Sequence, residues 1–533
     1  MLQRTLLWLL SAAVARAVDT LVELEYARYD GVQNDTGVTH WLGMRFAAPP
    51  VGDLRFAPPQ DPEDTGDKVM SADEHGPICR STPGEPDSNT TDEDCLFIDV
   101  YAPSDATTDN LLPVYFYISG GGFNSISDAN LNGTSLIQAS NHSIVTVTFN
   151  YRVGLFGFLA SAEVRDDPTA SVNNGLHDQR KALEWVQKYI HHFGGDPKHV
   201  TIGGASAGAA SVFYHLTAYN GRDDGLFHAA AAESQSFATV LTIEESQYQY
   251  DYIINATNCS TAGDTLSCLR SVPAPDIQRV NKNIPFPGSP GPPQYMYNVV
   301  IDSTLVPDLT YRLFATDQFL RVPVIFGDDT NGGTVFVPRN TSTRADQDAY
   351  LLNQFPYLTR DMLDALDALY ANPNATCPNT GCLWRKTSDI YGDLRYMCPG
   401  LYISEAYAAA GLPSWNYRYD VEDPAQIEEG LGVPHTVERS VIWGYGYPES
   451  YGPGGVNAWA VPLIQGYWTS FIRAYDPNRY RVEGAPAWEE WRAGGWDRLL
   501  FGTEGGTGME SVDEVHRGQC GFAFGVGVDI RQR

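Results

Sequence analysis

The five residues Gly204-Ala205-Ser206-Ala207-Gly208 carry the clearest chemical signal in this chain. They follow a strand-like run and precede AASVFYHL, a stretch that is compatible with a helix. Glycines on either side of a serine let the backbone turn sharply and leave the hydroxyl exposed at the turn. The pattern therefore predicts that Ser206 is a nucleophile. An ordinary glycine-rich turn is the alternative reading.

A serine hydroxyl needs a base to accept its proton and donors to stabilise the oxyanion that forms. The run YISGGGFNS places three glycines, Gly120 to Gly122, directly after a predicted strand. Their N–H groups can point at a substrate oxygen because no side chains obstruct it. His435 lies downstream in EEGLGVPHTVE, and serine before histidine is the order of an α/β-hydrolase. We expect His435 to be the base.

Strand-like and helical segments alternate along the chain and would position these residues. Short apolar runs predict buried strands at 112–120, 143–152, 199–206, 227–234, 322–327 and 414–421. The segment 176–193 has apolar residues at helical spacing and stops at Gly194-Gly195. This alternation predicts an α/β fold with a mostly parallel sheet covered by helices. We interpret the proline-rich segment 284–295 as a surface excursion inside one domain.

The composition excludes some classes of partner. The chain has 65 acidic and 35 basic residues, which give it a formal charge of −30. Nucleic acids and anionic membranes bind proteins through positive charge, so neither is an expected partner. The 8 cysteines include no C-x-x-C pair, which favours disulfides over zinc ligation. Sequence alone does not fix the pairing. One possible set joins residues that bracket polar loops, Cys79 with Cys95 and Cys259 with Cys268, and leaves Cys377 with Cys382 and Cys398 with Cys520.

The N-terminus has the pattern of a secretory signal peptide. Arg4 precedes a short apolar core from Leu6 to Val14, and Ala15-Arg16-Ala17 has the small-x-small form that signal peptidase accepts. A membrane-spanning helix needs about 20 apolar residues, and this core is shorter. We expect a signal peptide at 1–17, a mature domain at 18–533 and a secreted protein without a membrane span. Asn-x-Ser/Thr sequons agree with this route and predict a glycoprotein; they begin at Asn34, Asn89, Asn132, Asn141, Asn255, Asn258, Asn340 and Asn374.

The chain resembles the carboxylesterase type B family, the cholinesterase and fungal lipase group of α/β-hydrolases, over nearly its whole mature length. The motifs that carry this resemblance are GMRFAAPPVGDLRF (43–56), EDCLFIDVYAP (93–103), GGGF (120–123), FNYRVGLFGFLAS (149–161), GLHDQRKALEWVQKYIHHFGGDP (175–197), GASAG (204–208) and GVPHTVE (432–438). The phrases AESQSF (232–237) and YDPN (475–478) are most similar to the fungal branch.

The resemblance implies a site and a reaction. Ser206 would be the nucleophile that accepts the acyl group, and His435 the general base. The N–H groups of Gly121, Gly122 and Ala207 would form the oxyanion hole. Cys79–Cys95 and Cys259–Cys268 would be family disulfides. The implied reaction is hydrolysis of a small-molecule carboxylic ester through an acyl-enzyme, with no cofactor and no metal.

One departure from the family pattern concerns the triad acid. The family pattern Gly-Asp-x-x-x-Glu-Gly-Thr aligns with GDDTNGGT (327–334) and puts Gly332 at the catalytic glutamate. Glycine can neither hold the histidine tautomer nor stabilise an imidazolium, and loss of the acid costs about 10⁴-fold in kcat in serine proteases. Activity is then weak, or the acid has moved to Glu233 or Asp329. Asp329 is otherwise a turn residue and Glu233 a structural one. A catalytically impaired binding protein on the same scaffold is the alternative function.

Overall fold

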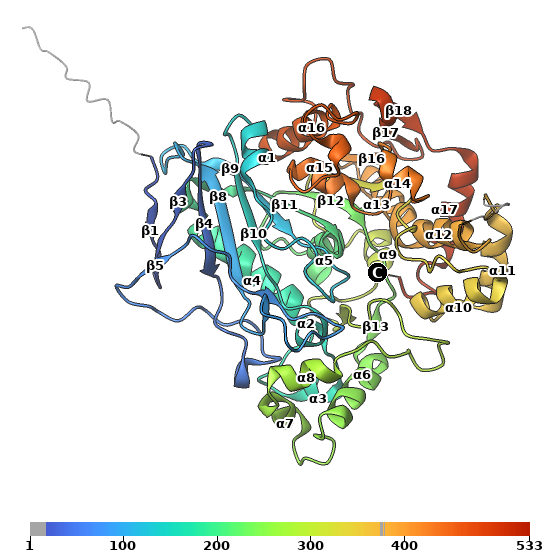
Figure 1. Ribbon diagram of the computed structural model, residues 1–533, viewed down its shortest axis with the longest axis horizontal. Coiled ribbons are helices and arrows are strands. Elements are labelled where there is room, and N and C mark those ends of the chain that lie inside the picture. The colour runs from blue at the N-terminus through green and yellow to red at the C-terminus, as the bar shows by residue number, and fades with distance from the viewer. Residues whose placement is uncertain (1–16, 374–376, 378, 533) are drawn as a thin grey trace, which may run out of the picture.

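The computed structural model describes residues 17–373, 377 and 379–532 (Figure 1). The centre of the fold is one 11-stranded sheet. The expected signal peptide lies outside the described residues except for Ala17. The strand order is β18-β17-β16-β15-β12-β11-β9-β10-β8-β4-β3. The strands of this sheet are β3 Val32–Gln33, β4 Val38–Arg45, β8 Phe97–Pro103, β9 Leu112–Ile118, β10 Val145–Phe149, β11 Gly195–Ser206, β12 Ala229–Gln235, β15 Val324–Asp329, β16 Ser414–Asp420, β17 Asp497–Gly502 and β18 Gly508–Ser511.

The centre of the sheet is parallel, as the alternation of segments predicted. Parallel pairing joins β10 to β9, β9 to β11, and each later neighbour up to β17, whereas the strands at both edges are antiparallel. All six predicted strands form, as β9, β10, β11, β12, β15 and β16. The carboxyl ends of parallel strands meet at one edge of the sheet, where sites in open α/β sheets are built. The fold is that of an α/β-hydrolase in a single large domain.

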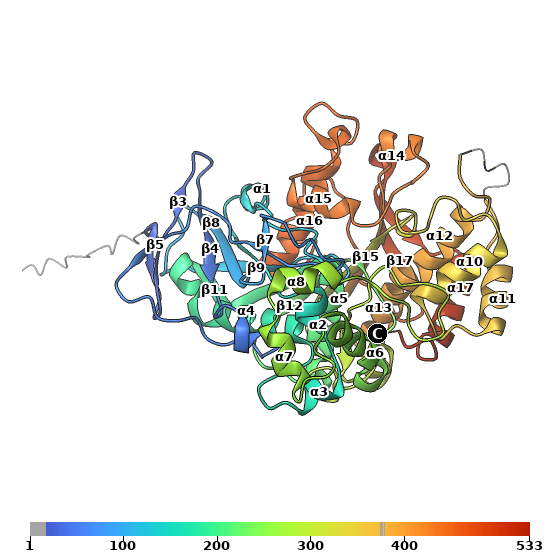
Figure 2. The ribbon, with the colours of Figure 1, turned by 60° about the horizontal axis from the view of Figure 1, so that its bottom comes forward.

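Smaller strands lie outside this sheet; they are β1 Leu21–Glu23, β2 Arg28–Asp30, β5 Val69–Ser71, β6 Ile78–Cys79, β7 Thr91–Asp92, β13 Leu241–Thr242 and β14 Val300–Ile301. Helices cover the sheet on both sides and extend beyond it (Figure 2). The α-helices are α1 Thr134–Ala139, α2 Gly154–Phe158, α3 Ala162–Asp166, α4 Asn174–Tyr189, α5 Ala207–Gly221, α6 Ile243–Ala256, α7 Thr265–Ser271, α8 Ala274–Val280, α9 Thr310–Ala315, α10 Arg344–Gln354, α11 Arg360–Leu369, α12 Trp384–Gly392, α13 Cys398–Ala409, α14 Pro424–Glu428, α15 Val437–Trp443, α16 Ala460–Ala474 and α17 Glu514–Val526.

Alternating side chains of β9 pack into the two main apolar clusters. Phe116 belongs to the cluster that includes Leu183 of α4 and Phe213 of α5. Tyr117 belongs to the other, which includes Trp443 of α15 and Trp468 of α16. This division follows from the period of two in a strand, and it explains why the parallel strands read as continuous apolar runs. The predicted helix at 176–193 is α4 with a 3₁₀ turn, Ile190–Phe193, and it ends at Gly194.

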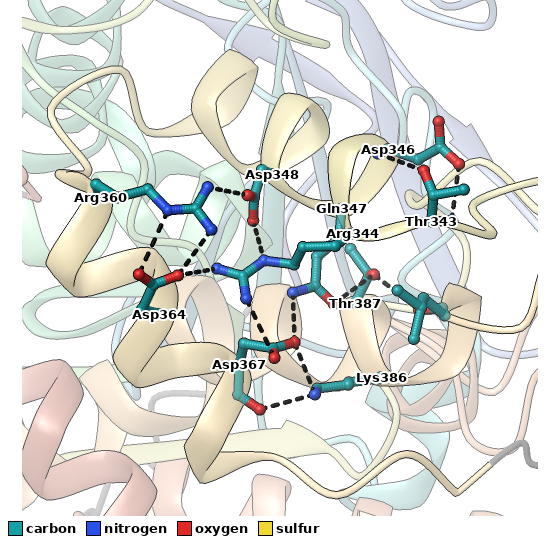
Figure 3. A network of polar contacts seen from close by, with 11 residues as sticks. Thr343, Arg344, Asp346, Gln347, Asp348, Arg360, Asp364, Asp367, Lys386 and Thr387 are labelled. Carbon is teal, nitrogen blue, oxygen red and sulfur yellow. Dashed lines mark hydrogen bonds and ion pairs between the residues drawn. The ribbon is translucent and has the colours of Figure 1, made fainter.

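Helices α10, α11 and α12 are joined by ion pairs (Figure 3). Arg344 of α10 contacts Asp348, Asp364 and Asp367, at distances of 2.6, 2.8 and 3.1 Å. These pairs are partly exposed, so each contributes little free energy. Lys386 of α12 contacts Asp367 at 2.8 Å, and α12 also packs into the third apolar cluster before it continues into a π-helical turn, Asp393–Met397. That turn carries Arg395 and Tyr396, which lie at the candidate active site described below.

Every cysteine is paired: Cys79–Cys95, Cys259–Cys268, Cys377–Cys382 and Cys398–Cys520. The two disulfides that the resemblance implied are therefore confirmed, and the remaining pairs are those left by that set. In the described part of the chain, no helix is long and apolar enough to cross a membrane.

The disulfides differ in the length of chain that they close. Cys398–Cys520 spans 122 residues and Cys259–Cys268 spans 9. Because chain entropy lost from the unfolded state grows with loop length, we expect the Cys398→Ala/Cys520→Ala variant to lose about 5 kcal/mol of unfolding free energy. The Cys259→Ala/Cys268→Ala variant should lose about half as much. Urea unfolding of the two variants measures the difference, and equal losses would contradict this ranking.

Candidate active site

Ser206 sits on a strained turn between a strand and a helix. Strand β11 ends at Ser206 and α5 begins at Ala207, and Ser206 has φ 58° and ψ −118°. A non-glycine residue adopts such a conformation only where the surroundings impose it. A Cβ atom on Gly208 would lie 1.9 Å from the Ile118 carbonyl oxygen, and one on Gly204 would lie 2.7 Å from the same atom. Both flanking glycines are therefore required by the close approach of this turn to β9.

The loop of three glycines after β9 begins against Ser206. A Cβ atom on Gly120 would be 3.1 Å from the Ser206 Cβ atom. Gly121 and Gly122 have φ values of 115° and 63°, in the region that favours glycine. Among the described residues, neither of their N–H groups donates a hydrogen bond. Ala207 is the first residue of α5, so its N–H has no acceptor within the helix. These three N–H groups are available to a substrate oxygen.

His435 lies in the loop between α14 and α15. The next two residues anchor this loop: the Thr436 N–H donates to Ser234 Oγ (3.3 Å) and the Val437 N–H to Asp329 Oδ2 (3.1 Å). Ser234 is at the carboxyl end of β12, which pairs with β11, and Asp329 is at the carboxyl end of β15, which pairs with β12. The sheet thus brings the loop of His435 to the edge where Ser206 ends its strand.

Aromatic rings rather than a carboxylate surround the imidazole of His435. The ring of Tyr396 is 4.1 Å away and that of Phe336 is 5.3 Å away, measured between centroids. Neither ring nitrogen makes a hydrogen bond to any described residue. Burial, and secondarily the positive charge of Arg395, lower the pKa of His435 to about 3. The imidazole is therefore neutral at physiological pH.

A Cβ atom at Gly332 would fit with a small shift of its neighbours. It would contact the Tyr396 ring at 3.3 Å and the Asp329 carbonyl oxygen at 3.7 Å. Gly333 differs, because a Cβ atom there would lie 1.9 Å from the Ser388 carbonyl oxygen. The position that aligns with the family's glutamate is thus a glycine beside Tyr396, the residue whose ring packs at a tilt against His435.

Glu233 and Asp329, the two candidates for a relocated acid, contact other groups in the structure. One Glu233 oxygen accepts hydrogen bonds from Tyr115 Oη (2.8 Å) and Trp468 Nε1 (3.0 Å). Burial raises the pKa of Glu233 to about 8, so this carboxyl is largely protonated at neutral pH. Asp329 Oδ2 accepts from Ser234 Oγ (3.0 Å) as well as from Val437. Burial and the nearby Glu438 also raise the pKa of Asp329. Neither carboxyl contacts the imidazole.

Sequence reasoning missed three residues that close the site, namely Tyr295, Arg395 and Tyr396. Tyr295 comes from the proline-rich excursion, and its ring would be 2.3 Å from a Cβ atom on Gly122. Arg395 and Tyr396 lie on the π-helical turn after α12. π-Helical turns are rare and occur often at functional sites, but no sequence pattern announces them.

The structure contains one cluster of possible metal ligands among its described residues, and it places most of the sequon asparagines. Cys398, His516 and Cys520 lie close together, but both cysteines are in a disulfide and do not offer thiolates to a metal. Asn89, Asn132, Asn141, Asn255, Asn258 and Asn340 are exposed, and Asn34 is half-buried. Asn374 lies outside the described residues. Glycosylation at the others stays a prediction.

The chain matches the sequence profile of the carboxylesterase family over residues 18–504. It belongs to the carboxylesterase family. Among its relatives, secreted lipase 4 of Gibberella zeae is 30% identical, and the match covers 91% of this chain and 88% of the lipase. Fumonisin B1 esterase of Sphingopyxis macrogoltabida is 30% identical, covering 90% and 86%. The crystal structure of Aspergillus niger EstA is 41% identical, with a TM-score of 0.91 over 96% of this chain and 99% of that one. The resemblance to this family and to its fungal lipases is confirmed, and the protein is a carboxylic ester hydrolase.

The raised pKa of Glu233 predicts a pH dependence of stability. Between the ordinary value of 4.5 and about 8, the folded state keeps this proton while the unfolded state releases it. The unfolding free energy therefore falls as pH rises, by about 1.4 kcal/mol per pH unit from this group. Glu233→Gln has no proton to lose and should decline less steeply in urea unfolding at pH 5 to 8.

The exposed Glu490 supplies a matched control, since Glu490→Gln should leave the slope of the wild-type protein unchanged. Equal slopes for Glu233→Gln and the wild type would show that Glu233 is ionised in the folded state.

Proposed function

We propose that this carboxylesterase is a secreted serine esterase that works through an acyl-enzyme on Ser206, with His435 as base and no triad acid. The observation that carries the proposal is the strained Ser206 turn packed against Gly120, the first residue of a glycine loop in which the N–H groups of Gly121 and Gly122 donate no hydrogen bond to a described residue. Strain of this kind, close to free donors, is typical of a site that stabilises a developing oxyanion.

The reaction follows from these groups. Ser206 Oγ attacks the ester carbonyl carbon, its proton passes to an imidazole nitrogen of His435, and the oxyanion accepts hydrogen bonds from Gly121, Gly122 and Ala207. The C–O bond to the alcohol then breaks, and His435 returns the proton to the leaving alkoxide. Water repeats the sequence on the acyl-enzyme and releases the acid. The proton transfer requires a hydrogen bond between Ser206 and His435, a contact that often tightens only with substrate bound.

Absence of the acid makes His435 a weak base. A base is most effective when its pKa is near the working pH, and burial holds that of His435 far below it. No anion stabilises the imidazolium as it forms. The contacts of Glu233 and Asp329 favour a missing acid over a relocated one, so we expect slow turnover.

Two observations bear on the class of ester that this protein hydrolyses. One relative is named a lipase and another a fumonisin B1 esterase, at the same identity of 30% to this chain. The short segment between Cys79 and Cys95 favours a soluble ester over an oil droplet, because it is shorter than the flap of the family's lipases. Secretion through residues 1–17 agrees with the names of secreted relatives. A catalytically impaired binding protein stays the alternative.

Ser206→Ala tests the nucleophile. A neutral fluorophosphonate should label the wild-type protein at Ser206 and leave the variant unlabelled, since the phosphorus bonds only to an activated hydroxyl. Hydrolysis of p-nitrophenyl acetate should fall at least about 10³-fold. Peptide mapping by mass spectrometry and steady-state kinetics measure both. Hydrolysis that persists in Ser206→Ala would refute the assignment, and a wild-type protein that neither labels nor hydrolyses would favour the binding alternative.

Gly332→Glu tests the missing acid. The added carboxylate should orient the imidazole and stabilise its protonated form, which raises kcat by about 10²- to 10⁴-fold. It should also raise the pKa of His435 and so move the acid limb of kcat/KM to higher pH. Gly332→Gln has the same size without the charge and should show neither change. An unchanged Gly332→Glu combined with a large loss in Glu233→Gln would instead locate the acid at Glu233.

A further inference from the structure

Arg395 is a buried cation without an anionic partner. The residue is 4% exposed, and among the described residues no carboxylate lies within ion-pair distance of it. Its Nε donates to Ser236 Oγ at 3.1 Å, and its two terminal nitrogens donate to no described residue. Burying an unpaired charge is costly. Two other buried arginines are paired, Arg152 with Asp178 (2.7 Å) and Arg498 with Glu510 (2.8 Å), whereas Arg80, which is 8% exposed, has no ion pair with a described residue.

The position of Arg395 connects it to both halves of the active site. Its guanidinium carbon is 5.6 Å from the ring centroid of Tyr295 and 5.9 Å from that of Tyr396. The Tyr295 ring lies against Gly122, a proposed oxyanion donor, and the Tyr396 ring packs at a tilt against His435. Aromatic faces stabilise a cation only in part, and they do not carry a compensating charge. The rings hold the guanidinium beside the reacting groups without neutralising it.

A cavity adjoins this guanidinium. Arg395 and Tyr295 line it together with polar residues that include Gln249 and Gln354, and its volume is about 50 Å³. A cavity of this kind needs roughly 10–15 Å³ to hold one water molecule, so it accommodates a group the size of a carboxylate. A planar guanidinium with two free nitrogens matches the two oxygens of a carboxylate.

We propose that Arg395 binds a carboxylate carried by the ester itself, so the preferred substrates are half-esters of dicarboxylic or polycarboxylic acids. This inference rests on the proposed esterase function. The formal charge of −30 gives no long-range attraction for an anion. Selection of such a substrate must therefore come from a local, buried cation, and Arg395 supplies it next to the oxyanion loop.

The test compares matched esters at pH 7.5. Monomethyl esters of succinic, glutaric, adipic and pimelic acid carry the carboxylate, and their dimethyl esters lack it. We expect kcat/KM to be about 10- to 100-fold higher for the best monoester than for its diester, the effect of a charge-assisted hydrogen bond. The chain length that gives the highest ratio reports the spacing between Ser206 and Arg395.

Variants assign the preference to Arg395. In Arg395→Gln the ratio should fall toward one, and in Arg395→Lys it should recover in part. Arg492→Gln, which removes a cation from an exposed site, should keep the wild-type ratio. A wild-type protein without a preference for monoesters, or an Arg395→Gln variant that keeps the preference, would overturn the proposal.

A binding measurement separates this inference from the esterase function. Glutarate should protect Ser206 from the fluorophosphonate and raise the melting temperature of the wild-type protein, and should do neither in Arg395→Gln. A protein that labels and hydrolyses diesters, yet shows no glutarate effect, contradicts the carboxylate site alone. A protein that neither labels nor hydrolyses contradicts the esterase function. The effect of glutarate on melting temperature then decides whether the carboxylate site exists.

Discussion

The active site depends on how closely the turn at residues 204–208 approaches strand β9. Ile118 leaves no room for a Cβ atom on either flanking glycine of Ser206, which itself has φ 58° and ψ −118°. Gly120, the first of the three glycines after β9, lies against the serine. The packing of these neighbouring parallel strands thus brings the proposed nucleophile to the loop of the proposed oxyanion donors. The conformational strain at Ser206 is sustained by the buried sheet beneath it.

The histidine is held by a different set of interactions. Ser234 Oγ is 3.0 Å from Asp329 Oδ2 and 2.5 Å from Glu438 Oε1, and these buried groups anchor the residues that follow His435. They fix where the loop lies, but they provide no charge to the imidazole. The aromatic surroundings remove water and lower the pKa of His435. Burial and the lack of a hydrogen-bond partner on either ring nitrogen therefore act in the same direction, toward a neutral and weakly basic histidine.

Much of this arrangement could be predicted from the sequence. The apolar runs identified the central strands because parallel strands are buried on both faces, and Gly204-Ala205-Ser206-Ala207-Gly208 marked the turn because only glycine fits beside Ile118. The contacts that modify the site could not be predicted. Tyr295, Arg395 and Tyr396 lie 89 to 190 positions after Ser206 in an irregular excursion and a π-helical turn, which have no periodic pattern. Glu233 looked available to His435 because it ends a neighbouring strand, but its side chain bonds to Tyr115 and Trp468.

The proposed mechanism depends on His435 being a buried, neutral base without a carboxylate partner. An NMR titration of the imidazole tests this, with ¹³C-labelled histidine and with His435→Gln to assign its signal among the 11 histidines. We expect the Cε1 shift of His435 to stay constant from pH 8 down to pH 5, because its pKa lies near 3. A titration midpoint at or above the ordinary value of 6.5 would contradict it, since that requires an anion beside the ring.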